Sequence, residues 1–364
     1  MSHPRLSLAL EAFGPLPPEG RIALFRPTAT TDLSDLTADL TAARLHAVQG
    51  FRPDHDALAA RGLSVSPRAE GAYAAALVFV PRAKAEARAL LHAANEAVPP
   101  GAPVWVDGLK TDGIDALLRD LRALLPISPP IAKAHGKIFA FAASPGALEP
   151  WAARPGHPAE GFTTLPGVFS ADAVDRGSAL LAACLPETLP ARMADLGAGW
   201  GWLGAQVLAR KGVESLDLVE AEHAALECCK MNISDPRARF HWADATAVKF
   251  ENRPLGVVMN PPFHVARQAD PALGAAFIRA AAGLLSLSGT LWMVANRHLP
   301  YDAVLQACFH EVVELTPPGG RDGAFRVIRA ERPIAHAGSQ KPGTQPGPGE
   351  AGAASRRRVA RSRR

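Results

Sequence analysis

The stretch ARMADLGAGWGWLGAQVLARKG (191–212) passes from an apolar run through a glycine-rich turn into a helical pattern. Asp195 precedes three glycines, Gly197, Gly199 and Gly201, which recur at every second position. Glycine allows a backbone to turn sharply and to come close to a ligand. A strand, a glycine turn and a helix in this order predict a βα unit of an open sheet, with a ligand crevice at the turn.

Strand-like and helix-like segments alternate downstream of this turn, which favours a parallel sheet. A further helical segment, 173–185, precedes the turn, and PPGGRDG (317–323) predicts a closing hairpin near the end. The predicted fold class is therefore α/β, with a doubly wound, mostly parallel sheet that has an antiparallel end. The predicted strands are 214–220, 238–246, 255–260, 289–296, 310–317 and 324–331, and the predicted helices are 221–233, 270–289 and 301–309.

The first 150 residues show the same alternation but no glycine-rich turn, so no nucleotide site is expected in them. Their predicted strands are 21–27, 74–81, 102–109 and 137–143, and their predicted helices are 83–98 and 113–125. A Pro-, Gly- and Ala-rich segment predicts a linker, and a non-periodic Pro-, Gly- and Ser-rich end predicts disorder. The predicted division is a first domain over 1–150, a linker over 151–166, a second domain over 167–333 and a disordered, arginine-rich tail over 334–364.

The composition excludes several classes of protein. No window approaches 18 uninterrupted apolar residues, and the N-terminus lacks the features of a signal peptide. The four cysteines form no C-x-x-C pair, which favours reduced thiols in the cytoplasm over a metal site. The net charge of +4 comes from the tail, because eight Lys/Arg and two Asp/Glu lie from Glu331 onward and leave about −2 for the rest. We expect a cytoplasmic monomer without metal, whose tail is either merely solvated or contacts phosphates.

The acidic residue inside the glycine turn indicates the kind of ligand. Dinucleotide sites favour G-x-G-x-x-G with a pyrophosphate at the helix N-terminus, and a carboxylate there would repel it. The carboxylate of Asp195 suits a ligand with an ammonium group, such as S-adenosyl-L-methionine. Glu220 ends the next strand, where an acid can bind ribose hydroxyls, and Asp244 ends the third, where an acid can meet an adenine amino group. The alternative is a tight turn without a ligand. The predicted cofactor residues are Asp195, Gly197, Gly199, Gly201, Glu220 and Asp244.

The segment VVMNPPFH (257–264) places polar and aromatic groups at the end of a strand beside the same crevice. The Asn260 carboxamide oxygen can accept a hydrogen bond from an exocyclic amino group, and Pro261 offers only a carbonyl acceptor. Phe263 can stack on a base. Such a pocket aims an amino nitrogen at a methyl donor, whereas the alternative is a structural Asn-Pro turn. The predicted catalytic residues are Asn260, Pro261, Pro262 and Phe263, and His264 receives no firm role.

Together, D-x-G-x-G-x-G and N-P-P-F resemble the class I S-adenosylmethionine-dependent methyltransferases that act on an amino nitrogen. NPPFH resembles the bacterial ribosomal RNA guanine-N2 methyltransferases of the small-subunit type, as do the segments 165–181, 294–305 and 106–114. The resemblance implies a degenerate, methyltransferase-like first domain that helps folding and holds RNA. It also implies N2 methylation of a flipped guanine in 16S ribosomal RNA, in the assembled 30S subunit.

Other readings keep or change this chemistry. The same motif serves enzymes that methylate large-subunit guanine, adenine N6 or protein glutamine, although the glutamine and DNA enzymes more often have Tyr or Trp where Phe263 stands. A third reading is a non-catalytic ribosome-assembly protein that binds RNA. The chain also departs from the family, because Ala198 stands where Cys is frequent, and Trp200 and Trp202 are bulky for the turn. We expect both tryptophans to pack without abolishing cofactor binding.

Overall fold

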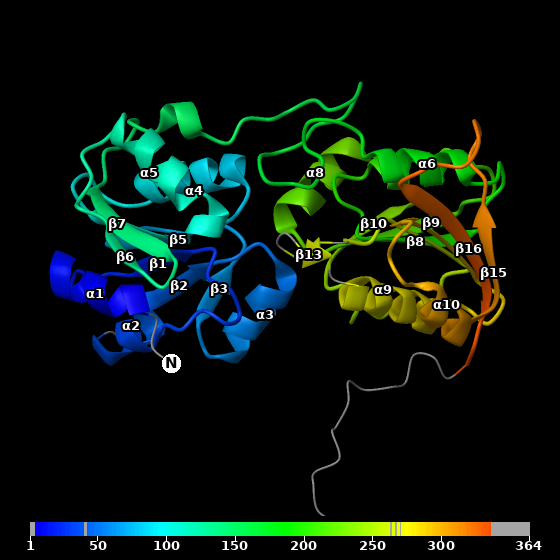
Figure 1. Ribbon diagram of the computed structural model, residues 1–364, viewed down its shortest axis with the longest axis horizontal. Helices are drawn as coiled ribbons and strands as arrows, with labels where there is room; N and C mark the ends of the chain where they lie inside the picture. Colours follow the sequence, from blue (N-terminus) through cyan, green and yellow to red (C-terminus); the bar gives the residue numbers. More distant parts are fainter. Residues whose placement is uncertain (1–3, 40–41, 263, 266–267, 270, 336–364) are drawn as a thin grey trace, which may run out of the picture.

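The computed structural model describes residues 4–39, 42–262, 264–265, 268–269 and 271–335. These residues form two α/β units, each built on a seven-stranded sheet, that lie side by side along the long axis (Figure 1). The predictions for Phe263 and for nearly all of the arginine-rich tail fall outside the described residues. No helix in these ranges is long and apolar enough to cross a membrane.

The first unit contains every strand and helix that the sequence predicted between residues 21 and 143. It also contains elements that were not predicted, most of them before residue 70, where the sequence carries no clear pattern. Its elements are α1 (Pro4–Phe13), β1 (Ile22–Phe25), α2 (Ser34–Asp39), η1 (Ala42–Arg44), β2 (Leu45–Val48), α3 (Arg52–Ala60), β3 (Ser64–Ser66), β4 (Ala75–Phe79), α4 (Lys84–Glu96), β5 (Pro103–Leu109), η2 (Lys110–Asp112), α5 (Ile114–Arg122), β6 (Ile131–Lys133), β7 (Gly136–Ala142) and η3 (Glu149–Trp151).

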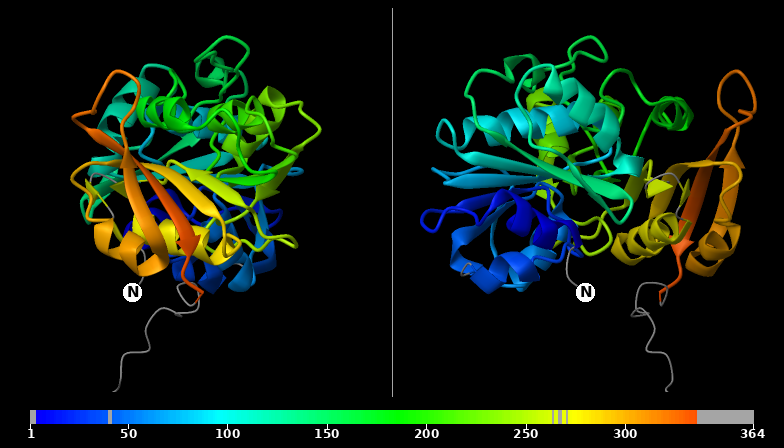
Figure 2. Two further views of the ribbon diagram at one scale, coloured as in Figure 1. Left: turned by 90° about the vertical axis from the view of Figure 1, so that its right-hand side faces the viewer. Right: turned by 60° about the vertical axis from the view of Figure 1, so that its left-hand side comes forward.

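The second unit confirms the predicted doubly wound sheet and its closing hairpin, β15–β16, which lies at the edge facing away from the first unit (Figure 2). A short hairpin, β12–β13, was not predicted. The elements are α6 (Arg176–Cys184), β8 (Arg192–Leu196), α7 (Trp202–Leu208), β9 (Ser215–Glu220), α8 (His223–Asn232), β10 (Ala238–Trp242), β11 (Gly256–Met259), β12 (His264–Val265), β13 (Gln268–Ala269), α9 (Pro271–Leu284), β14 (Thr290–Asn296), α10 (Asp302–Cys308), β15 (Phe309–Leu315) and β16 (Phe325–Pro333).

The central strands are apolar on both faces because helices cover both. In β1, Ile22 and Leu24 pack on one side and Ala23 and Phe25 on the other, and all four are at most 1% exposed. Continuous apolar runs of this kind are typical of parallel strands buried between two helical layers. Figure 1 shows the layers, with α4 and α5 above the first sheet and α1 and α2 below it.

The two sheets have the same topology. Their strand orders, β3-β2-β1-β4-β5-β7-β6 and β10-β9-β8-β11-β14-β16-β15, correspond strand for strand, with matching parallel and antiparallel pairs. The register agrees as well: Phe25 pairs with Val48 as Leu196 pairs with Val219, so each residue lies 171 positions before its counterpart. The first unit is thus a second copy of the fold, as the resemblance implied.

Equivalent loops of the two copies join the units. The backbone N–H of Arg52 donates to the carbonyl of Ala221 at 2.8 Å, and that of His223 donates to the carbonyl of Gly50 at 2.9 Å. Because each donor and each acceptor again lie 171 positions from their counterparts, the contact has an approximate twofold symmetry. Within the predicted linker, Trp151 packs in the core of the first unit and residues 156 and 164 pair with each other. The domain boundaries stay predictions.

Candidate active site

The glycine turn follows β8 directly and leads into α7, as the sequence predicted. All three glycines have positive φ angles, 80° at Gly197, 56° at Gly199 and 91° at Gly201. A Cβ on Gly201 would lie 2.8 Å from the Cys229 sulfur, so this glycine allows the turn to pack on α8. A Cβ on Gly199 would meet nothing within 4 Å, and Gly197 and Gly199 both line a cavity. The backbone at Gly197 and Gly199 therefore forms a part of the cavity wall that a ligand can approach closely.

Asp195 lies one residue before the end of β8 and is completely buried. Among the described residues, neither of its carboxyl oxygens has a hydrogen-bond partner. Burial, and secondarily the negative charge of Glu220, raise the pKa of Asp195 to about 8. A buried carboxyl without a partner is costly, and a cation placed against it would favour its ionised form. Asp195 itself does not line the cavity that contains Gly197 and Gly199, and its predicted role towards an ammonium group stays a prediction.

Glu220 is the last residue of β9, and its side chain accepts hydrogen bonds from the glycine turn and from the loop that follows β9. One carboxylate oxygen accepts the backbone N–H of Gly199 at 2.8 Å, and the other accepts that of Glu222 at 2.7 Å. Burial raises the pKa of Glu220, and these N–H groups oppose the shift. Because a carboxylate has about four acceptor positions, it can accept further donors, such as a hydroxyl of a ribose. Its predicted role in binding stays a prediction.

Asp244 lies in the loop after β10, where one of its oxygens accepts the backbone N–H and the hydroxyl of Thr246, both at 2.7 Å. It is half-buried and does not line the cavity that contains the glycines. Because β10 pairs in parallel with β9, Asp244 and Glu220 both lie at the carboxyl ends of these two neighbouring strands. Its predicted contact with adenine stays a prediction.

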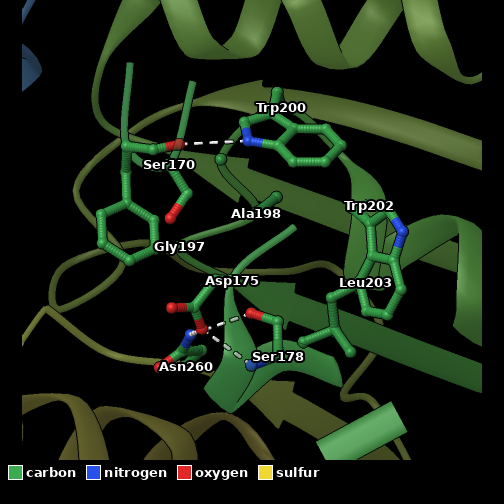
Figure 3. A pocket seen from close by; sticks show the side chains of 11 residues that line it. Ser170, Asp175, Ser178, Gly197, Ala198, Trp200, Trp202, Leu203 and Asn260 are labelled. Atoms are coloured by element: carbon green, nitrogen blue, oxygen red, sulfur yellow. Dashed lines mark hydrogen bonds between the residues drawn. The ribbon is translucent and has the colours of Figure 1, made fainter. Parts of the chain in front are cut away.

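Asn260 follows β11 and lines the same cavity as Gly197 and Gly199 (Figure 3). Its amide nitrogen donates to the Asp175 carboxylate at 2.6 Å and to the Ser178 hydroxyl at 2.9 Å. Because a carboxylate only accepts hydrogen bonds, Asp175 fixes which end of the amide faces it. The amide oxygen is buried and has no partner among the described residues. The structure thus holds one acceptor ready for a donor group.

Asp175 and Ser178 are site residues that the sequence analysis did not assign. Asp175 is the N-cap of α6 and accepts the backbone N–H of Ser178 at 2.8 Å, so the same oxygen caps the helix and holds Asn260. The signal in the sequence was an Asp three residues before a Ser at a helix start, which is a capping pattern. It gave no hint of Asn260, 85 residues away.

Separating the two roles of Asp175 gives a first prediction. Asp175→Ser keeps a good N-cap but is too short to reach Asn260, whereas Asp175→Ala loses both contacts. We expect kcat for methyl transfer to fall about tenfold in both, the value of one charge-assisted hydrogen bond. Thermal unfolding should detect about 1 kcal/mol of lost stability in the alanine variant only. Wild-type kcat in Asp175→Ser would show that Asp175 serves α6 alone.

Aromatic side chains surround the cavity. Trp200 is 5% exposed and packs edge-on against Phe162, and its indole N–H donates to the Phe169 carbonyl at 3.1 Å (Figure 3). Trp200 therefore packs in the core, as expected, and it also lines the cavity. Trp202 lines the cavity, and Phe169 lines it while remaining 66% exposed, which makes Phe169 a flat apolar surface beside the site.

The remaining predicted catalytic residues are the two prolines and Phe263. Pro261 is buried and Pro262 is exposed, and Phe263 lies outside the described residues. The four cysteines are free thiols. Within the described ranges no cluster of three or more His, Cys, Asp or Glu side chains could hold a metal ion.

The chain is similar to known methyltransferases over most of its length. A family model described as "Methyltransferase small domain" matches residues 160–328. The "Ribosomal RNA small subunit methyltransferase C" proteins of Pectobacterium atrosepticum and Pseudomonas paraeruginosa are 31% and 30% identical to it. These alignments cover 70% and 72% of this chain and 73% and 80% of the relatives.

A solved structure agrees with these relatives. It is the T. thermophilus 16S rRNA N2 guanine methyltransferase RsmC in complex with AdoMet and guanosine. The match has a TM-score of 0.72 and 26% identity, and it covers 90% of this chain and 92% of that one. Both copies of the fold are therefore shared. The protein belongs to the ribosomal RNA small subunit methyltransferase C family.

Proposed function

We propose that the protein transfers a methyl group from S-adenosylmethionine to the exocyclic N2 of a guanine in 16S ribosomal RNA. The observation that carries the proposal is the buried amide oxygen of Asn260, which has no partner among the described residues, while Asp175 holds the amide nitrogen in the cavity that Gly197 and Gly199 also line. The family membership supports it, and so does the AdoMet and guanosine bound by the solved relative.

The cofactor would supply an electrophilic methyl group on a sulfonium. Asp195 would hold its ammonium, the glycine turn would lie against its methionine part, and Glu220 and Asp244 would hold ribose and adenine. Asp195 ionises when it meets the cation, which removes the cost of its unpartnered burial. The Asp195 carboxyl, which has no partner among the described residues, supports the first assignment, and the free space beside Gly199 supports the second.

Catalysis by the chain would consist mainly of orientation. The Asn260 oxygen and the Pro261 carbonyl would accept the two N–H groups of the guanine amino group, which fixes its plane and aims the nitrogen lone pair at the methyl group. The new N–C bond forms as the S–C bond breaks, and the nitrogen then gives up one proton to solvent. No strong base is needed before attack, and a stacking surface such as Phe263 would hold the flipped base.

Several finer points belong to the proposal. The substrate would be the assembled 30S subunit, in which the guanine is flipped out of structured RNA at a cost of a few kcal/mol. The protein would work in the cytoplasm as a monomer and without a metal ion. The nearest alternative keeps the chemistry and moves the target to a large-subunit guanine.

A second prediction tests the function directly. Labelled S-adenosylmethionine is offered with unmethylated 30S subunits, 50S subunits or naked 16S RNA, and the product nucleoside is identified by mass spectrometry. We expect N2-methylguanosine in 30S subunits only, and none with the Asn260→Ala variant as the control. Label in 50S subunits would move the proposed target from 16S rRNA to large-subunit rRNA. No label in any substrate would reject rRNA methylation.

A further inference from the structure

The first unit carries an arginine where the second carries a glycine of the cofactor turn. Arg26 follows β1 as Gly197 follows β8, and the backbone N–H of Arg26 donates to the carbonyl of Val48 as that of Gly197 donates to the carbonyl of Val219, both at 2.9 Å. Arg26 has a φ angle of 62°, a left-handed conformation that is uncommon outside glycine. By the same register, Gln49 stands where Glu220 stands. The counterpart of the cofactor site in the first unit is therefore filled by side chains of the chain itself.

The guanidinium of Arg26 joins both units. Its Nε pairs with Glu86 of α4 at 2.7 Å, one terminal nitrogen donates to the Gln49 amide oxygen at 2.8 Å, and the other pairs with Glu222 of the second unit at 2.8 Å. The side chains of Arg26, Glu86 and Glu222 are only 20%, 18% and 22% exposed. Such a partly desolvated, multiply bonded arginine holds its partners far more firmly than a surface ion pair does.

Glu222 connects this arginine to the cofactor site. It is the N-cap residue of α8, and its backbone N–H donates to the carboxylate of Glu220, whose other oxygen accepts the N–H of Gly199. The contacts thus form a chain from Arg26 through Glu222 and Glu220 to the glycine turn. The reciprocal backbone bonds of residues 50–52 with 221–223 hold the same loop on both sides of Glu222.

We propose that Arg26 is a positioning residue for the cofactor, which sets the Glu220 carboxylate through Glu222. The segment of the first unit that corresponds to the glycine turn would in this way support the cofactor site of the second unit. The inference rests on the proposed function only in that S-adenosylmethionine is the ligand of Glu220.

Removal of the arginine has a clear physical consequence. Glu86 and Glu222 both pair with the Arg26 guanidinium, so its loss leaves two neighbouring, largely buried carboxylates without their counter-ion. Each carboxylate raises the cost of ionising the other, and breaking a buried pair by removing one partner is strongly unfavourable. The loop that carries Glu222 must move to relieve this repulsion, and the N–H that holds Glu220 moves with it.

The experiment measures the affinity of the full chain for S-adenosylhomocysteine by calorimetry. We expect Arg26→Met to weaken binding about tenfold, within the usual range of coupling between linked sites. The matched control is Arg68→Met, which removes another ion pair between the units, Arg68–Glu227 at 3.2 Å, that does not lead to Glu220. It should bind as the wild type does. Unchanged affinity in Arg26→Met, or an equal loss in the control, would overturn the proposal.

A double-mutant cycle separates positioning from general destabilisation. In a Glu220→Gln background, Arg26→Met should cost little further affinity, because both changes act on the same contact. Additive losses would assign Arg26 a purely structural role. Gly50→Ala is a second variant that keeps the arginine: its Cβ would lie 2.7 Å from a Glu222 carboxylate oxygen, so we expect the same direction of change. If wild-type protein bound no S-adenosylhomocysteine at all, the proposed function itself would fail, whereas unchanged variants would reject only this inference.

Discussion

Asn260→Ala lowers kcat for guanine methylation by about a hundredfold or more, the usual effect of removing one preorganised polar group from an active site. The variant loses the buried amide oxygen, which has no partner among the described residues, and with it the proposed orientation of the amino group. Affinity for S-adenosylmethionine should stay near the wild-type value, because the glycine turn, Asp195 and Glu220 are untouched. A loss in kcat without a loss in cofactor binding identifies an interaction made in the transition state.

Single-turnover methylation of 30S subunits, with calorimetric titration of the cofactor, measures both quantities. Ser178→Ala is the matched control, because it removes the weaker of the two partners of the Asn260 amide and leaves Asp175 in place. We expect it to lose only a small part of the rate. Methylation by Asn260→Ala at the wild-type rate would refute the assigned role and would favour a turn of purely structural importance.

Asp195→Asn has two opposite effects, on ligand binding and on folding. The amide cannot neutralise an ammonium group, so we expect cofactor affinity to fall about a hundredfold, equivalent to roughly 3 kcal/mol for a buried charge pair that has lost one partner. The unliganded protein should at the same time become more stable at neutral pH and above, because the substitution removes a buried carboxyl that has no partner among the described residues.

The pH dependence gives the sign of the second effect. Folding raises the pKa of Asp195 from its ordinary value of 3.8 to about 8, because of burial and the neighbouring Glu220. The folded state therefore binds this proton more tightly than the unfolded chain, and the wild type loses stability as the pH rises from about 4 to about 8. The stability advantage of Asp195→Asn should grow over this window to at most about 6 kcal/mol and then level off.

Chemical denaturation of the unliganded proteins at pH 5, 7 and 9 measures this difference. Asp107→Asn is the control: Asp107 is buried like Asp195 but has a partner, accepting a hydrogen bond from Arg5 at 2.9 Å. It should lose stability where Asp195→Asn gains it. A destabilised Asp195→Asn protein at pH 9 would mean that the carboxyl has a stabilising partner in the unliganded state.

The sequence predicted those parts of the site that depend on local pattern. The glycine turn, Glu220 at the end of β9 and Asn260 after β11 each follow from a strand and the residues directly after it. Asp175 was missed because its contact with Asn260 is long-range and because its capping pattern is common to many helices.

The first unit shows a different limit of sequence analysis. The relation of Arg26 to Gly197 is invisible in the sequence, because the first copy has lost the glycines by which such a turn is found. It emerges only from strand register, where the spacing of 171 positions recurs from β1 to the start of α3. The strand β3 has three residues, fewer than the length at which an apolar pattern predicts a strand.

The symmetrical contact between the loops at residues 50–52 and 221–223 also sets an order of events during synthesis. Arg52 is translated 171 residues before His223, and at roughly 5–20 residues per second the interval is about 10–30 s. Through this interval the loop at residues 50–52 has no second unit to pair with, and Arg26 lacks its partner Glu222. When the second unit is synthesised, the loop that carries Glu222 can pair with residues 50–52 of the first unit. The order of synthesis therefore makes the loop at residues 50–52 available before the loop at residues 221–223 that pairs with it.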